Sequence, residues 1–206
     1  MNIESVVWFN NLLLSSTTGV KLGKVKDIVD NFPYTKDNSL RGGVIPYTIV
    51  NKKIYFCLGL DNQHKEYTDF AGGYDIRHDR TPIQTPGREL MEESFSTFTL
   101  CEDNKLYDYH CIYAKGIFIV FACYGLDDPN FMESSCEAFK NNMELEKNEK
   151  KRKGVTFRPE MIDMKWFTKQ ELIDLMLTNK VYRKVASVLY PKLEEIVNIL
   201  IHTTEK

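Results

Sequence analysis

Three glutamates on one predicted helix constrain this chain more than any other feature of its sequence. Glu89, Glu92 and Glu93 are three and four residues apart, so a helix from about Thr85 to Phe98 places their carboxylates on one face. Like charges at this spacing destabilise a helix by roughly 0.2–0.5 kcal/mol per pair. A bound cation would compensate, and oxygen ligands favour Mg²⁺ or Mn²⁺. An exposed acidic helix face is the alternative explanation of these three residues alone.

The segment before this helix favours a binding site over a merely solvated face. Phe70–Tyr74 has the pattern of a short strand that ends in a glycine turn at Gly72 and Gly73. A glycine has no Cβ, so a ligand can approach the backbone closely at this point. The carbonyl of Gly72 is therefore a candidate to join the three carboxylates as a metal ligand.

The rest of the chain predicts an α/β sandwich around a mixed sheet, formed as one domain. The runs on either side of Asn51-Lys52 are rich in β-branched and aromatic residues and predict a hairpin. Thr168 and Glu171 form a capping box that predicts the start of a helix. Further strands are expected at 70–74, 106–113, 116–124 and 161–167, and further helices at 131–153 and about 180–201.

Composition indicates an ordinary soluble protein without a membrane partner. The chain has 206 residues, 43% of them hydrophobic and 27% charged, and no run approaches the roughly 20 apolar residues that span a bilayer. A net charge of −2 gives no overall attraction to nucleic acid. Five scattered cysteines without CxxC spacing indicate reduced thiols, so we expect a cytoplasmic location, with the nucleus not excluded.

Gly73 and the sequence from Arg88 to Glu93, within the segment Gly73 to Ser96, resemble the Nudix box. That motif is Gly, five residues, Glu, seven residues, Arg-Glu, an aliphatic residue, any residue, Glu-Glu, any residue, Gly and an aliphatic residue. Its second half is matched by Arg88, Glu89, Leu90, Glu92 and Glu93. The resemblance implies a Nudix-like α/β/α sandwich with a core at 41–177, preceded by a helical extension at 1–40 and followed by a C-terminal helix at 178–206.

The resemblance also implies roles for individual residues. Glu89, Glu92 and Glu93 would bind a divalent metal, and Glu89 has the alternative role of positioning water as a base. Arg88 would brace the loop by pairing with an upstream acid, with Gly73 as structural support. Glu160, just before the predicted strand at 161–167, is the candidate general base, although an ordinary loop glutamate is an equal alternative. Asp163 is a weaker candidate, and His78 is expected to be solvated.

Three departures from the motif lead to predictions about local structure. The loop after Gly73 is one residue longer, so either Asp79 or Arg80 takes the place of the first motif glutamate, and we choose Asp79 as the partner of Arg88. Phe95 replaces the motif glycine, which predicts that the helix continues into Ser96–Phe98. Pro86 is expected at the first helical position, after a Thr85 cap.

The resulting functional hypothesis is hydrolysis of a nucleoside diphosphate linked to another moiety, with Mg²⁺ or Mn²⁺ as cofactor. One alternative is mRNA decapping or cleavage of a diphosphoinositol polyphosphate, because a basic run favours a highly anionic substrate and could follow an RNA backbone. Another is a Nudix fold that only binds its ligand. The sequence leaves the oligomeric state open. The basic run consists of Lys147, Lys150, Lys151, Arg152 and Lys153.

Overall fold

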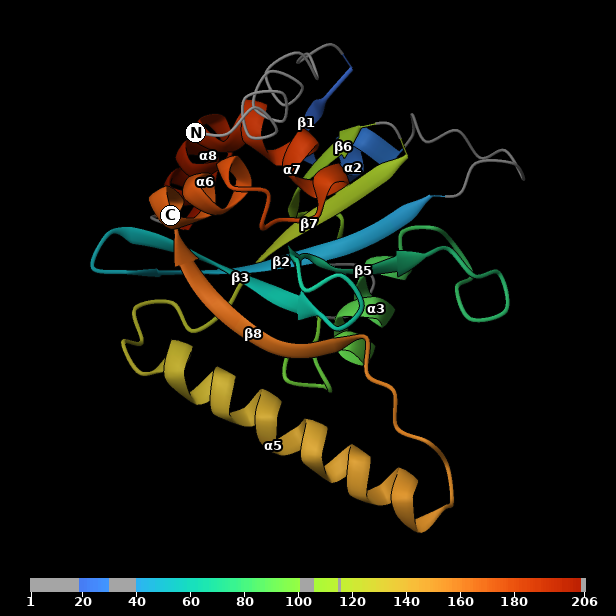
Figure 1. Ribbon diagram of the computed structural model, residues 1–206. Coiled ribbons are helices and arrows are strands. Elements are labelled where there is room, and N and C mark those ends of the chain that lie inside the picture. The colour runs from blue at the N-terminus through green and yellow to red at the C-terminus, as the bar shows by residue number, and fades with distance from the viewer. Residues whose placement is uncertain (1–18, 30–39, 101–105, 115, 205–206) are drawn as a thin grey trace.

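The computed structural model describes residues 19–29, 40–100, 106–114 and 116–204. In these residues eight strands form one mixed sheet with helices on both faces (Figure 1). The main order is β1-β6-β7-β2-β3-β4, while β5 pairs with β2 and β8 pairs with β3. Only β2 and β7 run parallel within the described strands. The strands are β1 (Lys21–Lys24), β2 (Arg41–Val50), β3 (Lys53–Asp61), β4 (Tyr67–Thr68), β5 (Phe70–Gly73), β6 (His110–Ala114), β7 (Ile117–Cys123) and β8 (Met161–Thr168).

The predicted hairpin is present as β2 and β3. Asn51 and Lys52 both have positive φ, 52° and 61°, as the tight turn between two antiparallel strands requires. β2 lies at the centre of the sheet because its first residues pair with β5 on one side and with β7 on the other. The glycine end of β5 therefore lies beside the first residues of this central strand.

Two helical layers cover the sheet and confirm the predicted sandwich (Figure 1). One layer contains α6 (Lys169–Leu177), α7 (Arg183–Leu189) and α8 (Leu193–Thr204), and the other contains α3 (Thr85–Glu93) and α5 (Phe131–Arg152). Each layer packs on its own apolar cluster, since alternate residues of β2 point to opposite faces. No helix among the described residues is long and apolar enough to cross a membrane.

The two ends of the chain differ from the sequence interpretation. The single helix expected at 180–201 is wrong, because a 3₁₀ turn at Tyr190–Lys192 that contains Pro191 separates α7 from α8. At the other end, the helical extension expected over 1–40 includes a strand, since β1 pairs antiparallel with β6 before the short helix α2 (Val25–Val29). Residues 1–18 and 30–39 lie outside the described part of the chain.

The capping box at the start of α6 is confirmed. Thr168 Oγ1 accepts a hydrogen bond from the Glu171 N–H at 3.2 Å, and Glu171 Oε2 accepts one from the Thr168 N–H at 2.8 Å. These bonds satisfy two of the donors that a helix start leaves without partners.

Both ends of α3 correct the sequence predictions. Thr85 is the first helical residue rather than the cap, so Pro86 follows it at the second position. The helix ends at Glu93 instead of continuing to Phe98, because Phe95 adopts a left-handed φ of 52° where the motif has glycine. Such a conformation costs about 1–2 kcal/mol for a residue with a Cβ. Packing of the Phe95 ring on Phe139, at 5.2 Å between centroids, offsets that cost.

Candidate active site

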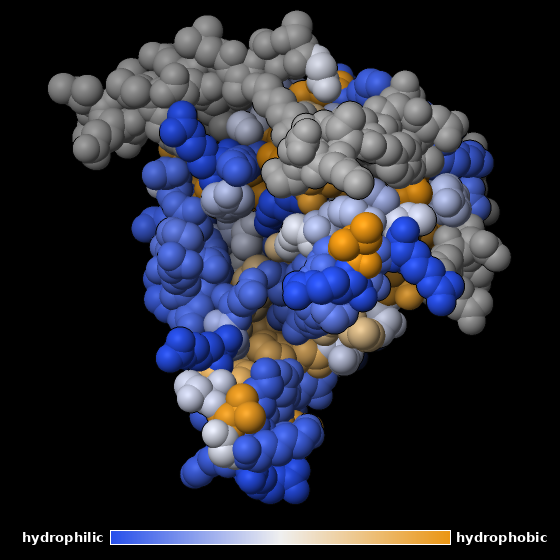
Figure 2. Space-filling model, turned by 90° about the vertical axis from the view of Figure 1, so that its right-hand side faces the viewer, coloured by the Kyte–Doolittle hydropathy of each residue, from blue (hydrophilic) through white to orange (hydrophobic). Residues whose placement is uncertain are grey.

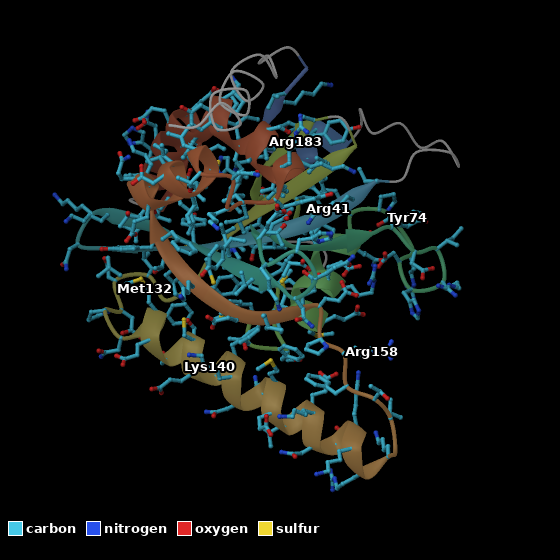
Figure 3. The ribbon with its side chains drawn as sticks, in the orientation of Figure 1. Arg41, Tyr74, Met132, Lys140, Arg158 and Arg183 are labelled. Atoms are coloured by element: carbon cyan, nitrogen blue, oxygen red, sulfur yellow. The ribbon has the colours of Figure 1, made fainter. Side chains whose placement is uncertain are left out.

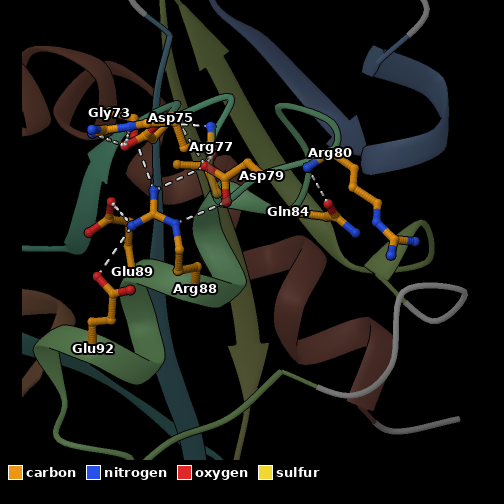
Figure 4. A network of polar contacts seen from close by, with 10 residues as sticks. Gly73, Asp75, Arg77, Asp79, Arg80, Gln84, Arg88, Glu89 and Glu92 are labelled. Atoms are coloured by element: carbon orange, nitrogen blue, oxygen red, sulfur yellow. Dashed lines mark hydrogen bonds and ion pairs between the residues drawn. The ribbon is translucent and has the colours of Figure 1, made fainter.

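Arg88 links the loop after β5 to helix α3 (Figure 4). Its guanidinium donates to both carboxylate oxygens of Asp79, from Nε at 2.9 Å and from Nη2 at 3.0 Å. The predicted Asp79–Arg88 pair is therefore present, while Arg80 contributes only its backbone N–H, to Gln84 Oε1 at 2.8 Å. The longer loop is accommodated without loss of the pair.

Asp79 is almost completely buried, with 1% of its surface exposed. Burial raises the pKa of this carboxyl group, but hydrogen bonds from Arg88, the Asp75 N–H and the Thr85 hydroxyl outweigh burial and leave the pKa below its usual value. The Thr85 hydroxyl donates to Asp79 at 2.9 Å, which explains why it does not cap the helix. Asp79 thus fastens the loop to both the start and the middle of α3.

The same guanidinium also reaches the metal-binding candidates. Arg88 Nη1 lies 2.7 Å from Glu89 Oε1 and 3.2 Å from Glu92 Oε2, and Nη2 donates to the Gly73 carbonyl at 3.1 Å. Arg88 consequently holds two of the three helix carboxylates and the end of β5 in one network. The carbonyl that it contacts is that of Gly73, whereas the candidate metal ligand is that of Gly72.

Gly72 of β5 lies against the Glu89 side chain of α3. A Cβ at this position would collide with the carboxylate of Glu89. A side chain at position 72 would therefore displace the Glu89 carboxylate from its present position. This contact gives a physical reason for the glycine turn that the sequence analysis singled out.

Glu93 is the most deeply placed of the three helix acids, at 7% exposed. Its Oε2 accepts a hydrogen bond from the Ala71 N–H at 2.5 Å. Burial raises the pKa of this carboxyl group well above its usual value, and the nearby acids Asp69, Glu89 and Glu160 add to that rise. For Glu89 the pKa is also raised, mainly by burial, against the opposing effect of Arg88.

Asp69 and Arg41 form a buried ion pair beside Glu93 that the sequence analysis missed. Asp69 is fully buried and accepts two hydrogen bonds from Arg41, at 2.8 and 2.7 Å. The Arg41 guanidinium lies 5.6 Å from the centre of the Tyr182 ring. Burial of an acid immediately before β5 could not be inferred from spacing, because the pairing of β5 with β2 brings Arg41 to it.

Glu160 lines the same cavity as the three glutamates of α3. The cavity has a volume of about 130 Å³, and its lining includes Glu89, Glu92, Glu93 and Glu160. Asn62, at the end of β3, holds this residue in place: its N–H donates to the Glu160 carbonyl at 2.7 Å, and its side chain donates to the Pro159 carbonyl at 3.1 Å. All four acids proposed from the sequence therefore face one space.

The two weaker candidates lie elsewhere. Asp163 does not line this cavity, and its charge acts on Cys57 of β3 and on Cys136 of helix α5. His78 borders a different hollow, on the outer side of the loop. Cys57, Cys111, Cys123 and Cys136 are free thiols, whereas Cys101 lies outside the described residues.

The donor set suits a hard divalent cation, although its side chains already have protein partners. In the described parts of the chain no three His, Cys, Asp or Glu side chains are arranged to hold a metal. Arg88 contacts Glu89 and Glu92, and the Ala71 N–H contacts Glu93. Buried carboxylates that repel one another are nevertheless short of positive charge, and carboxylate oxygens are the ligands that Mg²⁺ and Mn²⁺ prefer.

No family model matches the chain, and no curated protein matches it either. Several solved structures do match the chain. A C. elegans Ap4A hydrolase in a binary complex is 16% identical, with a TM-score of 0.44, over 78% of this chain and 98% of that chain. The NUDIX domain of Shewanella oneidensis NrtR complexed with ADP ribose is 12% identical, with a TM-score of 0.42, over 82% of this chain and 97% of that one.

A third structure is the bifunctional NMN adenylyltransferase/ADP ribose pyrophosphatase of Francisella tularensis, complexed with AMP and a Mn ion. It is 14% identical, with a TM-score of 0.41, over 92% of this chain and 48% of that one. Nudix proteins are thus among the solved structures that this chain resembles. The likeness is distant and concerns the fold, so the chemistry has to be argued from the residues of this chain.

Proposed function

We propose that this chain is a Nudix-type hydrolase that uses Mg²⁺ or Mn²⁺ to cleave a diphosphate linkage in a nucleoside diphosphate joined to another moiety. The observation that supports it most is that one cavity is lined by Glu160 together with the α3 residues Glu89, Glu92 and Glu93. Arg88, fixed by Asp79, ties that helix to the glycine end of β5. Asp79, which we choose for the first motif position, lies 2.9 Å from Arg88 Nε.

The proposed ligands of the cation are Glu92 and Glu93, with Glu89 and the Gly72 carbonyl as additional ligands. Glu92 is the most adaptable, because 58% of its side chain is exposed and its contact with Arg88 is long, at 3.2 Å. When bound, a divalent cation supplies charge stabilisation for phosphate oxygens and lowers the pKa of water. The Glu160 carboxylate would accept the proton of the attacking water, from a backbone position held by Asn62.

The first experiment is a panel assay. The purified protein is incubated with Mg²⁺ or Mn²⁺ and with ADP-ribose, dinucleoside polyphosphates, nucleoside triphosphates, capped RNA and diphosphoinositol phosphates, and release of nucleoside monophosphate or phosphate is measured. Turnover that depends on the divalent cation is expected for at least one substrate. Tight binding of a panel member without any turnover would support a non-catalytic binding module and contradict the hydrolase.

Glu160→Gln tests the assignment of the base. We expect kcat to fall by about 10²–10⁴-fold with unchanged melting temperature, since general-base catalysis contributes about that much. Glu144→Gln is the matched control, because Glu144 is an exposed acid on α5 that pairs only with Lys147 among the described residues. Equal activity of the two variants would remove Glu160 from catalysis.

The basic run at the end of α5 gives little support to an RNA substrate. Lys147, Lys150 and Lys153 each form an ion pair with a glutamate one turn earlier on the same helix, at 2.9, 2.9 and 2.5 Å. These pairs neutralise part of the charge that would follow a phosphate backbone. Filter binding across a salt series tests decapping: if capped RNA binds no better than free nucleotide and its affinity has no salt slope, the decapping alternative fails.

A further inference from the structure

The acid-lined cavity also contains two cationic side chains. Lys150, near the end of α5, and Arg158, six residues beyond the end of that helix, line the same cavity as the α3 glutamates. Neither residue belongs to the segment that resembles the Nudix box. The wall that they form is built by a part of the chain that the motif does not describe.

The fold returns the chain along the end of helix α5 to build this wall. After Arg152 the chain turns at Gly154, whose φ of 69° suits glycine, and the Val155 N–H donates to the Lys150 carbonyl at 2.9 Å. The segment 155–160 then leads back to β8. In Figure 3 Arg158 lies on this returning segment, next to α3, and the molecule narrows at its lower end in Figure 2, where the end of α5 lies.

Phe157 and Asn62 fix the two sides of Arg158. The Phe157 ring lies 6.1 Å from the ring of Phe95 and 5.9 Å from Lys150 Nζ, measured between ring centres and from the nitrogen to the ring centre. On the other side, the Asn62 side chain donates to the Pro159 carbonyl at 3.1 Å. The backbone of Arg158 is thus held between an aromatic anchor and a hydrogen-bonded one, which restricts where its guanidinium can reach.

The two cations differ in whether they form an ion pair within the protein. Lys150 Nζ lies 2.9 Å from Glu146 Oε1, and 42% of the Lys150 side chain is exposed. Arg158 is exposed and has no ion-pair partner within the residues that the structure describes. Its neighbours in the cavity are carboxylates, but it does not pair with them. A guanidinium in this situation retains its full set of donors for an anion, and guanidinium groups bind phosphate in a two-pronged geometry.

We propose that Arg158, assisted by Lys150, binds a phosphate group of the substrate on the side of the diphosphate that faces away from the α3 glutamates. This inference rests on the proposed function, because it takes the α3 side of the cavity to be the metal side. Phe157 is a positioning residue that orients the wall. The ligand class is a small molecule with at least two linked phosphates.

The charges of the cavity imply that a diphosphate enters with a divalent cation. Besides the four acids already named, Glu146 also lines the cavity, so five carboxylates stand against two cations. A free anion would meet net repulsion inside a partly desolvated space. We therefore expect ADP to bind far more tightly in the presence of Mg²⁺ than in its absence. Arg158 should contribute to affinity only when the ADP anion is bound.

Titration calorimetry with ADP, with and without Mg²⁺, tests the subsite. In Mg²⁺ we expect Arg158→Gln to raise the Kd about tenfold and Lys150→Gln to raise it less, because Glu146 already shares that charge. Arg158→Lys should recover part of the affinity. Lys151→Gln is the matched control. It removes one positive charge from α5, the helix that carries Lys150, at a residue that does not line the cavity, and the Kd for ADP should stay unchanged.

Equal Kd values for Arg158→Gln and Lys151→Gln would overturn the subsite, and so would failure of the wild-type protein to bind ADP in Mg²⁺. Melting temperatures of all variants show that a change in Kd does not come from unfolding. The hydrolase proposal fails separately: an Arg158 effect on ADP binding without turnover of any panel substrate would retain the anion subsite and reject catalysis.

Discussion

The two faces of the sheet use burial in different ways. Helices α6, α7 and α8 bury apolar side chains such as Leu172, Met176 and Leu189 at 0% exposure. The opposite face includes the segment from Asp69 to Glu93, which contains all four buried acids of the described residues: Asp69, Asp79, Glu89 and Glu93. Burial of an apolar side chain stabilises the fold, whereas burial of a carboxylate costs free energy unless charge or hydrogen bonds compensate.

The difference suggests that stability and chemistry are located on separate faces. Asp79 and Asp69 have arginine partners, so their burial is compensated within the protein. Glu93 accepts one backbone hydrogen bond and is surrounded by other acids. Under the proposed function, a bound cation would stabilise this carboxylate. Variants on the two faces should therefore separate stability from activity.

The largest effect on stability is expected on the apolar face. Leu172→Ala removes a fully buried side chain and leaves a cavity, so unfolding in urea should show a loss of about 2–5 kcal/mol. Gln170→Ala, two residues earlier on the exposed side of α6, is the control and should change stability by less than about 0.5 kcal/mol. Turnover per folded molecule should be the same in both variants. A specific loss of turnover in Leu172→Ala would mean that the two faces are not independent.

A smaller loss of stability is expected when the ion pair between Asp79 and Arg88 is broken. Asp79→Asn removes the charge that pairs with Arg88 in a nearly buried position, and a loss of about 2–3 kcal/mol is expected. Because the pKa of Asp79 is lowered in the folded protein, its contribution is present above the unfolded pKa and is lost as the pH falls through the folded pKa. The stability difference between wild type and variant should thus be full at neutral pH and shrink below about pH 4.

Urea unfolding of wild type and Asp79→Asn between pH 3 and pH 7 measures this difference. Unlike Leu172→Ala, the Asp79→Asn variant should also lose turnover, since Arg88 orients Glu89 and Glu92. A constant difference in stability at all these pH values would contradict the charged Asp79–Arg88 pair.

The smallest effect is expected at the start of α6. Thr168→Ala removes the capping box and should cost about 1 kcal/mol, without an effect on turnover. Thr168→Ser retains the hydroxyl and is the matched control. Equal losses in the two variants would show that the methyl group of Thr168, rather than its hydrogen bonds, contributes the stability.

The sequence predicted those parts of the molecule that depend on local pattern. The hairpin at Asn51-Lys52, the capping box and the α3 helix follow from turn chemistry and periodicity within a few residues. The Asp79–Arg88 pair was also predictable, because the motif supplies one partner and the loop offers only two candidates for the other. Local rules succeed where the interacting groups are close in sequence.

The parts that failed depend on contacts between distant residues. The helix stop at Phe95 is held by Phe139, which is 44 positions away and could not be paired with it from the sequence. Strand β1 is a strand only because β6 lies beside it, and the Asp69–Arg41 pair exists because β5 adds to β2. The wall with Arg158 likewise requires the return of the chain along α5. Tertiary contacts decide these features, and a single sequence does not contain them in readable form.

The central claim is that the buried acids of α3 hold a divalent cation. The most direct test is the melting temperature of wild type and Glu93→Gln, each with and without Mg²⁺. Mg²⁺ should raise the melting temperature of the wild-type protein, since a ligand at about 100 times its Kd adds roughly 2.7 kcal/mol of stability. Without metal, Glu93→Gln should melt at the same temperature or slightly higher, because the repulsion with Glu89 is relieved.

With Mg²⁺ the variant should show little further rise, and its hydrolysis of the best substrate should be lower by orders of magnitude, about 10²–10³-fold or more. A rise in melting temperature with Mg²⁺ that is as large in Glu93→Gln as in wild type, together with near-wild-type turnover at limiting Mg²⁺, would remove Glu93 from the metal site and contradict the account.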